Sequence, residues 1–159
     1  MERFEDQFVI ATIRRGNTRT VAGDHPEIRK GDILRVLVTK AKRRELTAAL
    51  GKRQPQVPFV DKRLVIENVV VSNTDIAGRT VEELNLFRRY GGRIVHVERG
   101  DEEFLASFDT HLDAGDRVTV IVDQDRMGDI RDYFGDSVQG YSQLNWIAVG
   151  GGLFLGYLI

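Results

Sequence analysis

The sequence contains no cysteine in its 159 residues, and proline, methionine and histidine are scarce. A chain without cysteine has no disulfide framework, no thiolate metal ligand and no cysteine nucleophile. An excess of one charge is also missing, because 23 basic residues are balanced by 24 acidic ones. A broad surface for nucleic acid requires a basic excess, so no nucleic-acid partner is expected.

The start of the chain, Met1 followed by ERFEDQ, is charged and therefore unlike a secretory signal peptide. The composition that remains is ordinary for a folded protein, with 42% hydrophobic and 30% charged residues. It supports a packed core, and the length predicts one domain or two small ones. A long apolar run occurs at the other end, where NWIAVGGGLFLGYLI occupies 145–159.

Two copies of one unit are present at a fixed offset of 84 positions, without a gap. IATIRRGN at 10–17 matches IVHVERGD at 94–101, and KGDILRVLV at 30–38 matches AGDRVTVIV at 114–122. An Arg-Gly pair and a Gly-Asp pair recur in one frame within a shared strand and turn pattern, which indicates an internal repeat. Within these two stretches the identical pairs are Ile10/Ile94, Arg15/Arg99, Gly16/Gly100, Gly31/Gly115, Asp32/Asp116, Val36/Val120 and Val38/Val122.

The second copy is the more complete and begins with a predicted strand and helix. Residues 64–73 (LVIENVVVSN) alternate apolar, mostly β-branched side chains, which is typical of a strand. Thr80 and Glu83 have the spacing of a capping box. A helix is therefore predicted over 81–91, with Gly91 as its end.

Three further strands and a closing helix follow, joined by turns. GRIVHVERG at 92–100 predicts a strand that a hairpin turn joins to FLASF, and RVTVIVD at 117–123 predicts the last strand. MGDIRDYFGD at 127–136 predicts the closing helix, so the order is β-α-β-β-β-α and the fold class is α+β. The residues expected to face the core are Val81, Leu84 and Phe87 on the helix and Val118, Val120 and Val122 on one face of the last strand.

The first copy lacks its opening strand and helix, because the positions that match 64–84 fall before Met1. The fold expected is therefore two tandem units, the first of them truncated at its N-terminus. The predicted divisions are a partial first unit at 1–52, a linker at 53–63, a second unit at 64–136 and a final segment at 137–159.

The final segment has no charged side chain. Its apolar part, 146–159, is shorter than the roughly 20 residues that a membrane helix needs. Ala148, Gly152 and Gly156 recur at the small-xxx-small spacing that lets membrane helices pack closely. We therefore expect 137–159 to be the start of a truncated transmembrane segment. The alternative is a buried terminal strand or core helix of the second copy.

The second unit resembles the RCK C-terminal domain, also called TrkA-C. The resemblance is carried by AGRTVEELNL at 77–86, by the strand that ends in Arg99 and Gly100, and by the AGD turn at 114–116. Paired units of this kind followed by FGDSVQGYSQLNWIAVGGGLFLGYLI resemble the aspartate:alanine exchanger family of prokaryotic secondary transporters. The resemblance covers essentially the whole chain.

In that family two such domains lie in the cytoplasmic loop between two membrane halves. The resemblance therefore implies a module at the cytoplasmic face of the cell membrane, whose partners are the membrane halves of the same transporter. It also implies small α+β domains that tend to pair, with contacts to a small-molecule or ion effector near the pair interface. A homodimer through the TrkA-C units is expected, while pairing between the two copies of one chain is an open alternative.

A nucleotide effector would require a basic pocket, for which the candidates are Arg88, Arg89 and Arg93 at the end of the predicted helix and the start of the next strand. The alternative is a solvated helix C-terminus whose cations complement the helix dipole. Cyclic-dinucleotide-binding TrkA-C domains have an aspartate, an arginine and an asparagine around this junction. Asn85, Phe87 and Arg93 do not match that pattern, so that ligand is not expected.

No pattern for catalysis is apparent, and neither an enzyme activity nor a metal or other cofactor is predicted. The three histidines are His25, His96 and His111, on different predicted elements. His96 alternates out of a strand face and is expected at the surface, and the other two are expected to be solvated in turns. The acidic residues at 101–103 predict a solvated hairpin tip, with a calcium site as the alternative.

The two Gly-Asp pairs, Gly31-Asp32 and Gly115-Asp116, predict tight turns. The glycine supplies backbone freedom, and the aspartate accepts a local backbone hydrogen bond. Two functional hypotheses follow from the sequence as a whole: a ligand-sensing regulatory module of a transporter, or a purely structural dimerisation module that binds nothing.

Overall fold

The computed structural model describes residues 8–54, 63–136 and 153–158, which form two antiparallel sheets with helices on their outer sides. The first sheet has the strand order β2-β1-β3-β9-β4, and the second has the order β5-β8-β6-β7. The first unit contains β1 (Phe8–Arg15), β2 (Thr18–Val21), β3 (Ile33–Thr39), α1 (Arg43–Leu50) and β4 (Arg53–Gln54). The second contains β5 (Leu64–Val70), α2 (Val81–Leu84), α3 (Leu86–Tyr90), β6 (Arg93–Arg99), β7 (Glu102–Leu105), β8 (Arg117–Asp123), the short 3-10 helix η2 (Gln124–Arg126) and α4 (Met127–Phe134). The α+β class is confirmed.

The two units repeat one another strand by strand, as the offset of 84 positions predicts. The pairs β2 and β7, β3 and β8, and α1 and α4 begin and end at matching positions. Even the irregularities recur. The register between β1 and β3 shifts between Ile10 and Thr12, and the register between β6 and β8 shifts between Ile94 and His96. These positions match, so the repeat extends to a β-bulge in the same place of each sheet.

The helix predicted over 81–91 is interrupted at Asn85, where the backbone is left-handed (φ 50, ψ 42). Its start and its end agree with the prediction, because the Thr80–Glu83 capping box forms and Gly91 ends α3 with φ 67. Residues two apart in a continuous helix face different directions. The break turns the chain so that Leu84 and Leu86 are both buried, and asparagine tolerates the left-handed conformation better than most residues.

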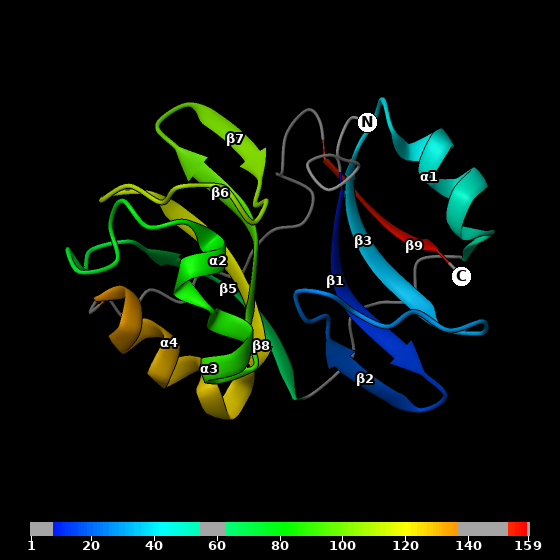
Figure 1. Ribbon diagram of the computed structural model, residues 1–159, viewed down its shortest axis with the longest axis horizontal. Coiled ribbons are helices and arrows are strands. Elements are labelled where there is room, and N and C mark those ends of the chain that lie inside the picture. Colours follow the sequence, from blue (N-terminus) through cyan, green and yellow to red (C-terminus); the bar gives the residue numbers. More distant parts are fainter. Residues whose placement is uncertain (1–7, 55–62, 137–152, 159) are drawn as a thin grey trace.

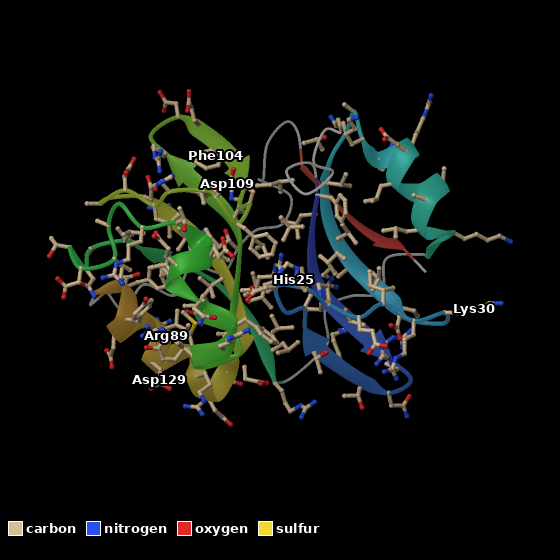
Figure 2. All side chains as sticks on the ribbon, in the orientation of Figure 1. His25, Lys30, Arg89, Phe104, Asp109 and Asp129 are labelled. Atoms are coloured by element: carbon tan, nitrogen blue, oxygen red, sulfur yellow. The ribbon has the colours of Figure 1, made fainter. Side chains whose placement is uncertain are left out.

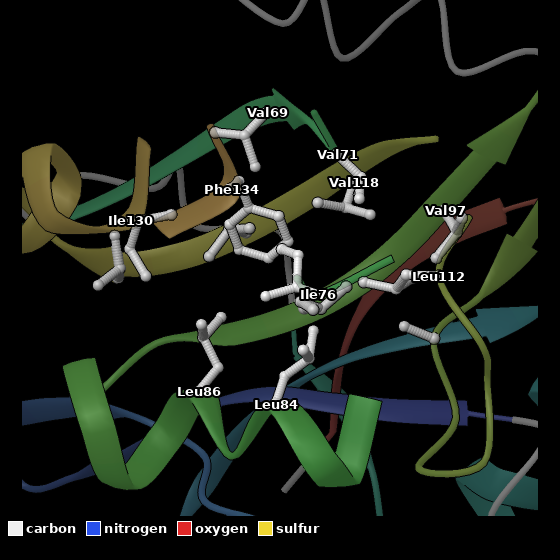
Figure 3. Packing of buried hydrophobic residues seen from close by; sticks show 14 of the residues in the cluster. Val69, Val71, Ile76, Leu84, Leu86, Val97, Leu112, Val118, Ile130 and Phe134 are labelled. Carbon is white, nitrogen blue, oxygen red and sulfur yellow. The ribbon is translucent and has the colours of Figure 1, made fainter. Parts of the chain in front are cut away.

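An outer apolar cluster lies between the second sheet and α2, α3 and α4 (Figure 3). Phe134 of α4 is fully buried there and packs among residues from both the sheet and the helices. Val118, Val120 and Val122 belong to this cluster, as predicted for one face of the last strand. The opposite face of β8 is buried as well, since Ile121 faces the first sheet. A smaller cluster under α1 packs on the outer side of the first sheet.

The strand β9 (Leu153–Leu158) differs from the expectation for the end of the chain. A membrane helix was predicted here, but the segment pairs antiparallel with β3 and with β4. The alternative of a terminal strand in the second copy is also not met, because β9 joins the first sheet. An apolar segment can satisfy the open backbone groups of β3 in this way. Residues 137–152 lie outside the described part of the chain, and no helix within the described ranges is long and apolar enough to cross a bilayer.

Candidate functional site at the junction of the two units

The two sheets meet face to face through a shared apolar cluster (Figure 1). Matching positions of the two units contribute to it, so each unit presents the same face to the other. This is the arrangement of a self-complementary dimer interface, formed here within one chain. The pairing that the sequence left open is therefore present between the two copies. The matching contributors are Ala11 with Val95, Val21 with Leu105, and Leu37 with Ile121.

Buried polar residues accompany this cluster at matching positions of the two inner faces. Thr12 pairs with Arg35 in the first sheet, and the matching residues His96 and Thr119 pair in the second. All four are buried. His96 also pairs with Leu105 of the shared cluster, and cross-strand partners share a face. His96 therefore faces the first unit, and the prediction that it lies at the surface is wrong. The β-bulge at this position changes the alternation on which that prediction rested.

Burial lowers the pKa of His96, although Glu103 and Glu98 act in the opposite direction. Its Nε2 atom lies 3.8 Å from the Glu103 carboxylate. Protonation therefore favours the unfolded chain, whose histidine has a pKa near 6.5. The stability contributed by the neutral side chain is present above that pH and is lost as the pH falls through the lower folded value.

We expect the free energy of unfolding to fall between pH 7 and pH 5, and the His96→Gln variant to show a flatter profile over this window. Urea denaturation at several pH values measures the effect. His25→Gln is the matched control because His25 is exposed. If the free energy of unfolding depended on pH equally in the unaltered chain and in the His96→Gln variant, the role of His96 in this pH dependence would be contradicted.

Arg93 is the polar residue that joins the two units most directly. Its Nη1 atom donates hydrogen bonds to the backbone carbonyl oxygens of Ala22, at 3.2 Å, and Gly23, at 2.6 Å. The guanidinium carbon lies 5.5 Å from the centre of the Phe108 ring, within the range of a cation–π contact. Burial lowers the pKa of Arg93, and the nearby Asp24 carboxylate opposes that effect.

The ring of Phe87 lies directly against Gly23, so a larger residue at position 23 would displace the ring. A Cβ atom added to Gly23 would be 2.8 Å from Cε1 of Phe87, closer than real contacts allow. Phe87 was expected to face the core of its own unit, but it packs against the shared cluster. The α3 helix thus supplies an aromatic side chain to the junction, next to the Arg93 hydrogen bonds.

The other two predicted ligand residues have different surroundings from Arg93. Arg88 and Arg89 are exposed in the last turn of α3. The guanidinium carbon of Arg89 lies 5.7 Å from the ring centre of Tyr133 on α4 (Figure 2). Of the three arginines, Arg93 reaches the junction, while Arg89 contacts the outer helix of its own unit. Their role in ligand binding stays a prediction.

Each unit also contains an arginine–aspartate ion pair that sequence reasoning missed. In the first unit, Arg15 donates from Nε and Nη2 to the two carboxylate oxygens of Asp32, at 2.8 and 2.7 Å. In the second unit, Arg99 donates to Asp116 in the same manner, at 2.9 and 2.7 Å. Both aspartates are buried. The signal was available, because both members of the pair are identical in the two copies.

The Gly-Asp turns have the predicted geometry. Gly31 and Gly115 have φ values of 95 and 92, a region that favours glycine. Asp32 accepts a hydrogen bond from the backbone N–H of Arg29, and Asp116 accepts the matching bond from Asp113, both at 2.8 Å. The Arg15 hydrogen bond is the main cause that lowers the pKa of Asp32 to about 2. Burial acts to raise the pKa of Asp116, but Arg99 and the Asp113 N–H together lower it.

The remaining predicted turn residues are accessible to solvent. His25 and His111 are exposed, as predicted, and His25 lies at the boundary between the units, 5.8 Å from Phe108 between ring centres (Figure 2). The acidic residues at 101–103 are exposed in the β6–β7 hairpin. Within the described residues, no group of three or more histidine and carboxylate side chains is placed to hold a metal ion.

These features define a pair of small α+β units that share a buried interface. Residues 65–135 match the family model of the TrkA-C domain. The second unit is thus a TrkA-C domain, as the resemblance of its motifs indicated, and the first unit repeats its strands and closing helix.

Proteins with similar sequences are named as transporters. An uncharacterized transporter of Geobacter sulfurreducens is 34% identical over 152 residues, which cover 95% of this chain and 28% of that protein. An uncharacterized transporter of Corynebacterium diphtheriae is 33% identical over 153 residues, covering 96% and 28% respectively. The chain therefore spans little more than a quarter of the length of these relatives.

Two solved RCK C domains match parts of this chain. The dimer of this domain from S. agalactiae BusR, in complex with c-di-AMP, has 22% sequence identity and a TM-score of 0.41 over 44% of this chain and 95% of that one. The RCK C domain of the potassium transport protein KtrA, also in complex with c-di-AMP, has 17% identity and a TM-score of 0.41, covering 58% and 93%.

Proposed function

We propose that this chain is a regulatory module on the cytoplasmic face of a prokaryotic secondary transporter, of the aspartate:alanine exchanger type. The observation that carries the proposal is the similarity of nearly the whole chain to about a quarter of each of two proteins named transporters. The TrkA-C match of the second unit supports the regulatory part of the proposal. The partners of the module are then the membrane halves of the same polypeptide.

The module acts by binding a small molecule or an ion more tightly in one state of the transporter than in the other. Only such a difference in affinity can shift the equilibrium between two states. The junction is a suitable place for the effector, because Arg93 links the two units through the carbonyl groups of Ala22 and Gly23. An anionic ligand that competes for this guanidinium would change how the two units are held together. Arg88 and Arg89 are the further candidates to contact it.

We expect thermal unfolding of the purified chain to shift in the presence of its effector. A panel of nucleotides, amino acids and divalent cations tests this, with cyclic di-AMP included because the sequence pattern argues against it. A ligand present at 100 times its dissociation constant should stabilise the folded chain by about 2.7 kcal/mol. The Arg88→Ala/Arg89→Ala double variant should reduce the thermal shift caused by an anionic ligand. Arg126→Ala is the matched control, because Arg126 is an exposed arginine on the 3-10 helix η2. No shift for any member of the panel would contradict the sensing role.

A purely structural role is the second candidate, and one observation favours it. The junction is mainly apolar, and the Nη1 atom of Arg93 is already used by two backbone carbonyl groups. In this case the repeat holds the membrane halves in a fixed relation, and a dimer of transporters forms through the same modules. Sedimentation measurements on the chain, together with the ligand panel, distinguish the two roles. A stable dimer without any ligand response would favour the structural one.

A further inference from the structure

The side of β3 that pairs with β9 has the same place in the first sheet as the side of β8 that pairs with β5 in the second. The order β9-β3-β1-β2 repeats the order β5-β8-β6-β7. β3 and β8 are matching strands, and so are β1 and β6, and β2 and β7. The strand β9 therefore occupies, in the first sheet, the position that the opening strand β5 has in the second.

The agreement extends to the register. Leu153 of β9 lies opposite Thr39, and Leu64 of β5 lies opposite Asp123, the residue that matches Thr39. At the other end, Leu158 lies opposite Leu34, and Val69 lies opposite the matching Val118. Both pairings are antiparallel. Each residue of β9 thus takes the position of one residue of β5.

The chemistry of the preferred occupant can be taken from β5 itself. Leu64 and Ile66 face the shared cluster, while Val65 and Val69 face the outer cluster of the second unit. A strand at the edge of β3 has the shared cluster on one side and the cluster under α1 on the other. The site therefore suits an extended segment that carries apolar side chains toward both sides. Its main-chain hydrogen bonds to β3 provide affinity, as in other strand-addition complexes.

We propose that the edge of β3 is a strand-acceptor site, that its fitting occupant is an extended apolar segment of the β5 type, and that β9 is a replaceable occupant. A β5-type strand displaces β9 and releases 153–158. Under the proposed function, this release would free the segment to join the membrane half. That consequence depends on the proposed function, whereas the acceptor site does not.

A labelled peptide with the sequence of residues 63–71, RLVIENVVV, tests the site on the full chain. The double variant Leu155→Pro/Gly156→Pro weakens β9, because one of two consecutive residues directs its N–H toward β3 and proline has none. Fluorescence anisotropy should show the peptide binding this variant about tenfold more tightly than the unaltered chain, which corresponds to 1.4 kcal/mol. The control peptide carries proline at the positions of Glu67 and Asn68 and should bind neither chain.

Hydrogen exchange locates the bound peptide and keeps the test valid if the variant folds poorly. On the unaltered chain, excess peptide should reduce amide protection in β9 while β3 stays protected. Protection of β6 and β8 should not change, which reports that the second unit is folded. Equal affinity of the peptide for both chains, equal binding of the control peptide, or a change in protection at β8 instead of β9 would overturn the proposal. None of these outcomes depends on whether the chain senses a ligand.

Discussion

Replacing Ile121 by alanine is expected to lower the free energy of unfolding by about 2–4 kcal/mol, the range for removing a large aliphatic side chain from a packed interior. Ile121 is 1% exposed and lies in the shared cluster, opposite the face of β8 that packs on the helices. The substitution therefore leaves a cavity between the two units and not within either outer core. The loss of contact should weaken the coupling of the units as well as the total stability.

Urea denaturation monitored by circular dichroism measures this effect, with the slope of the transition as a test of coupling. A single transition in the unaltered chain should become broader or divide into two steps in the variant. Ile28→Ala is the matched control, because Ile28 is 43% exposed and the same atoms are removed. The control is expected to change stability by no more than about 0.5 kcal/mol. If both variants unfold alike, the two sheets do not share a buried interface.

The second large effect is expected for Asp116→Ala, at about 2–3 kcal/mol. The Asp116 side chain is 2% exposed and accepts two hydrogen bonds from Arg99 and one from the Asp113 N–H. Removing it takes the acceptor from Nε of Arg99 and from the Asp113 N–H, although Nη2 of Arg99 keeps its bond to the His111 carbonyl oxygen. A donor left without an acceptor costs more than the net value of its bond. The estimate lies below the cost of breaking a fully buried pair because Arg99 is partly exposed.

Asp113→Ala provides the control, since Asp113 also pairs with Arg99, at 3.0 Å, but its side chain is 57% exposed. An exposed pair of this kind contributes no more than about 1 kcal/mol. The pH dependence of the free energy of unfolding also distinguishes the Asp116 variant from the Asp113 variant. Because the folded pKa of Asp116 is below the usual value of 3.8, its contribution is present above that pH and is lost as the pH falls through the folded value. Equal losses in the two variants, or a difference that persists in strong acid, would contradict the ion-pair account.

The repeat is the part of the fold that the sequence predicts best. Glycine and aspartate at matching positions predicted the same turn twice, and the alternation of valines in β8 predicted a strand with one face in the core. The capping box at Thr80 placed the start of α2 at the correct residue. Signals of this kind are local, because each depends on residues within one turn or one strand.

The features that were missed depend on contacts between distant residues. A β-bulge decides that His96 faces the first unit, and alternation along one strand does not reveal a bulge. The break at Asn85 arises because both neighbouring leucines are buried, which the helical spacing of that segment does not require. The candidate site is affected in the same way. Arg93 was identified by its charge, but its partners lie in the other unit. They are the backbone carbonyl groups of Ala22 and Gly23, and a backbone carbonyl cannot be recognised as a partner from the residue type.

The position of β9 also has a consequence for the order in which the protein folds. The second unit, from β5 to α4, is continuous in sequence, so its sheet can close as soon as that stretch has left the ribosome. The first sheet is different, because the pairing of Leu34 with Leu158 joins segments that lie far apart in the sequence. Closing so long a loop is slow, since its entropy is lost before the contacts are gained. Of the two units in this chain, the one that is synthesised first is therefore completed last, on the surface that the finished second unit presents to it.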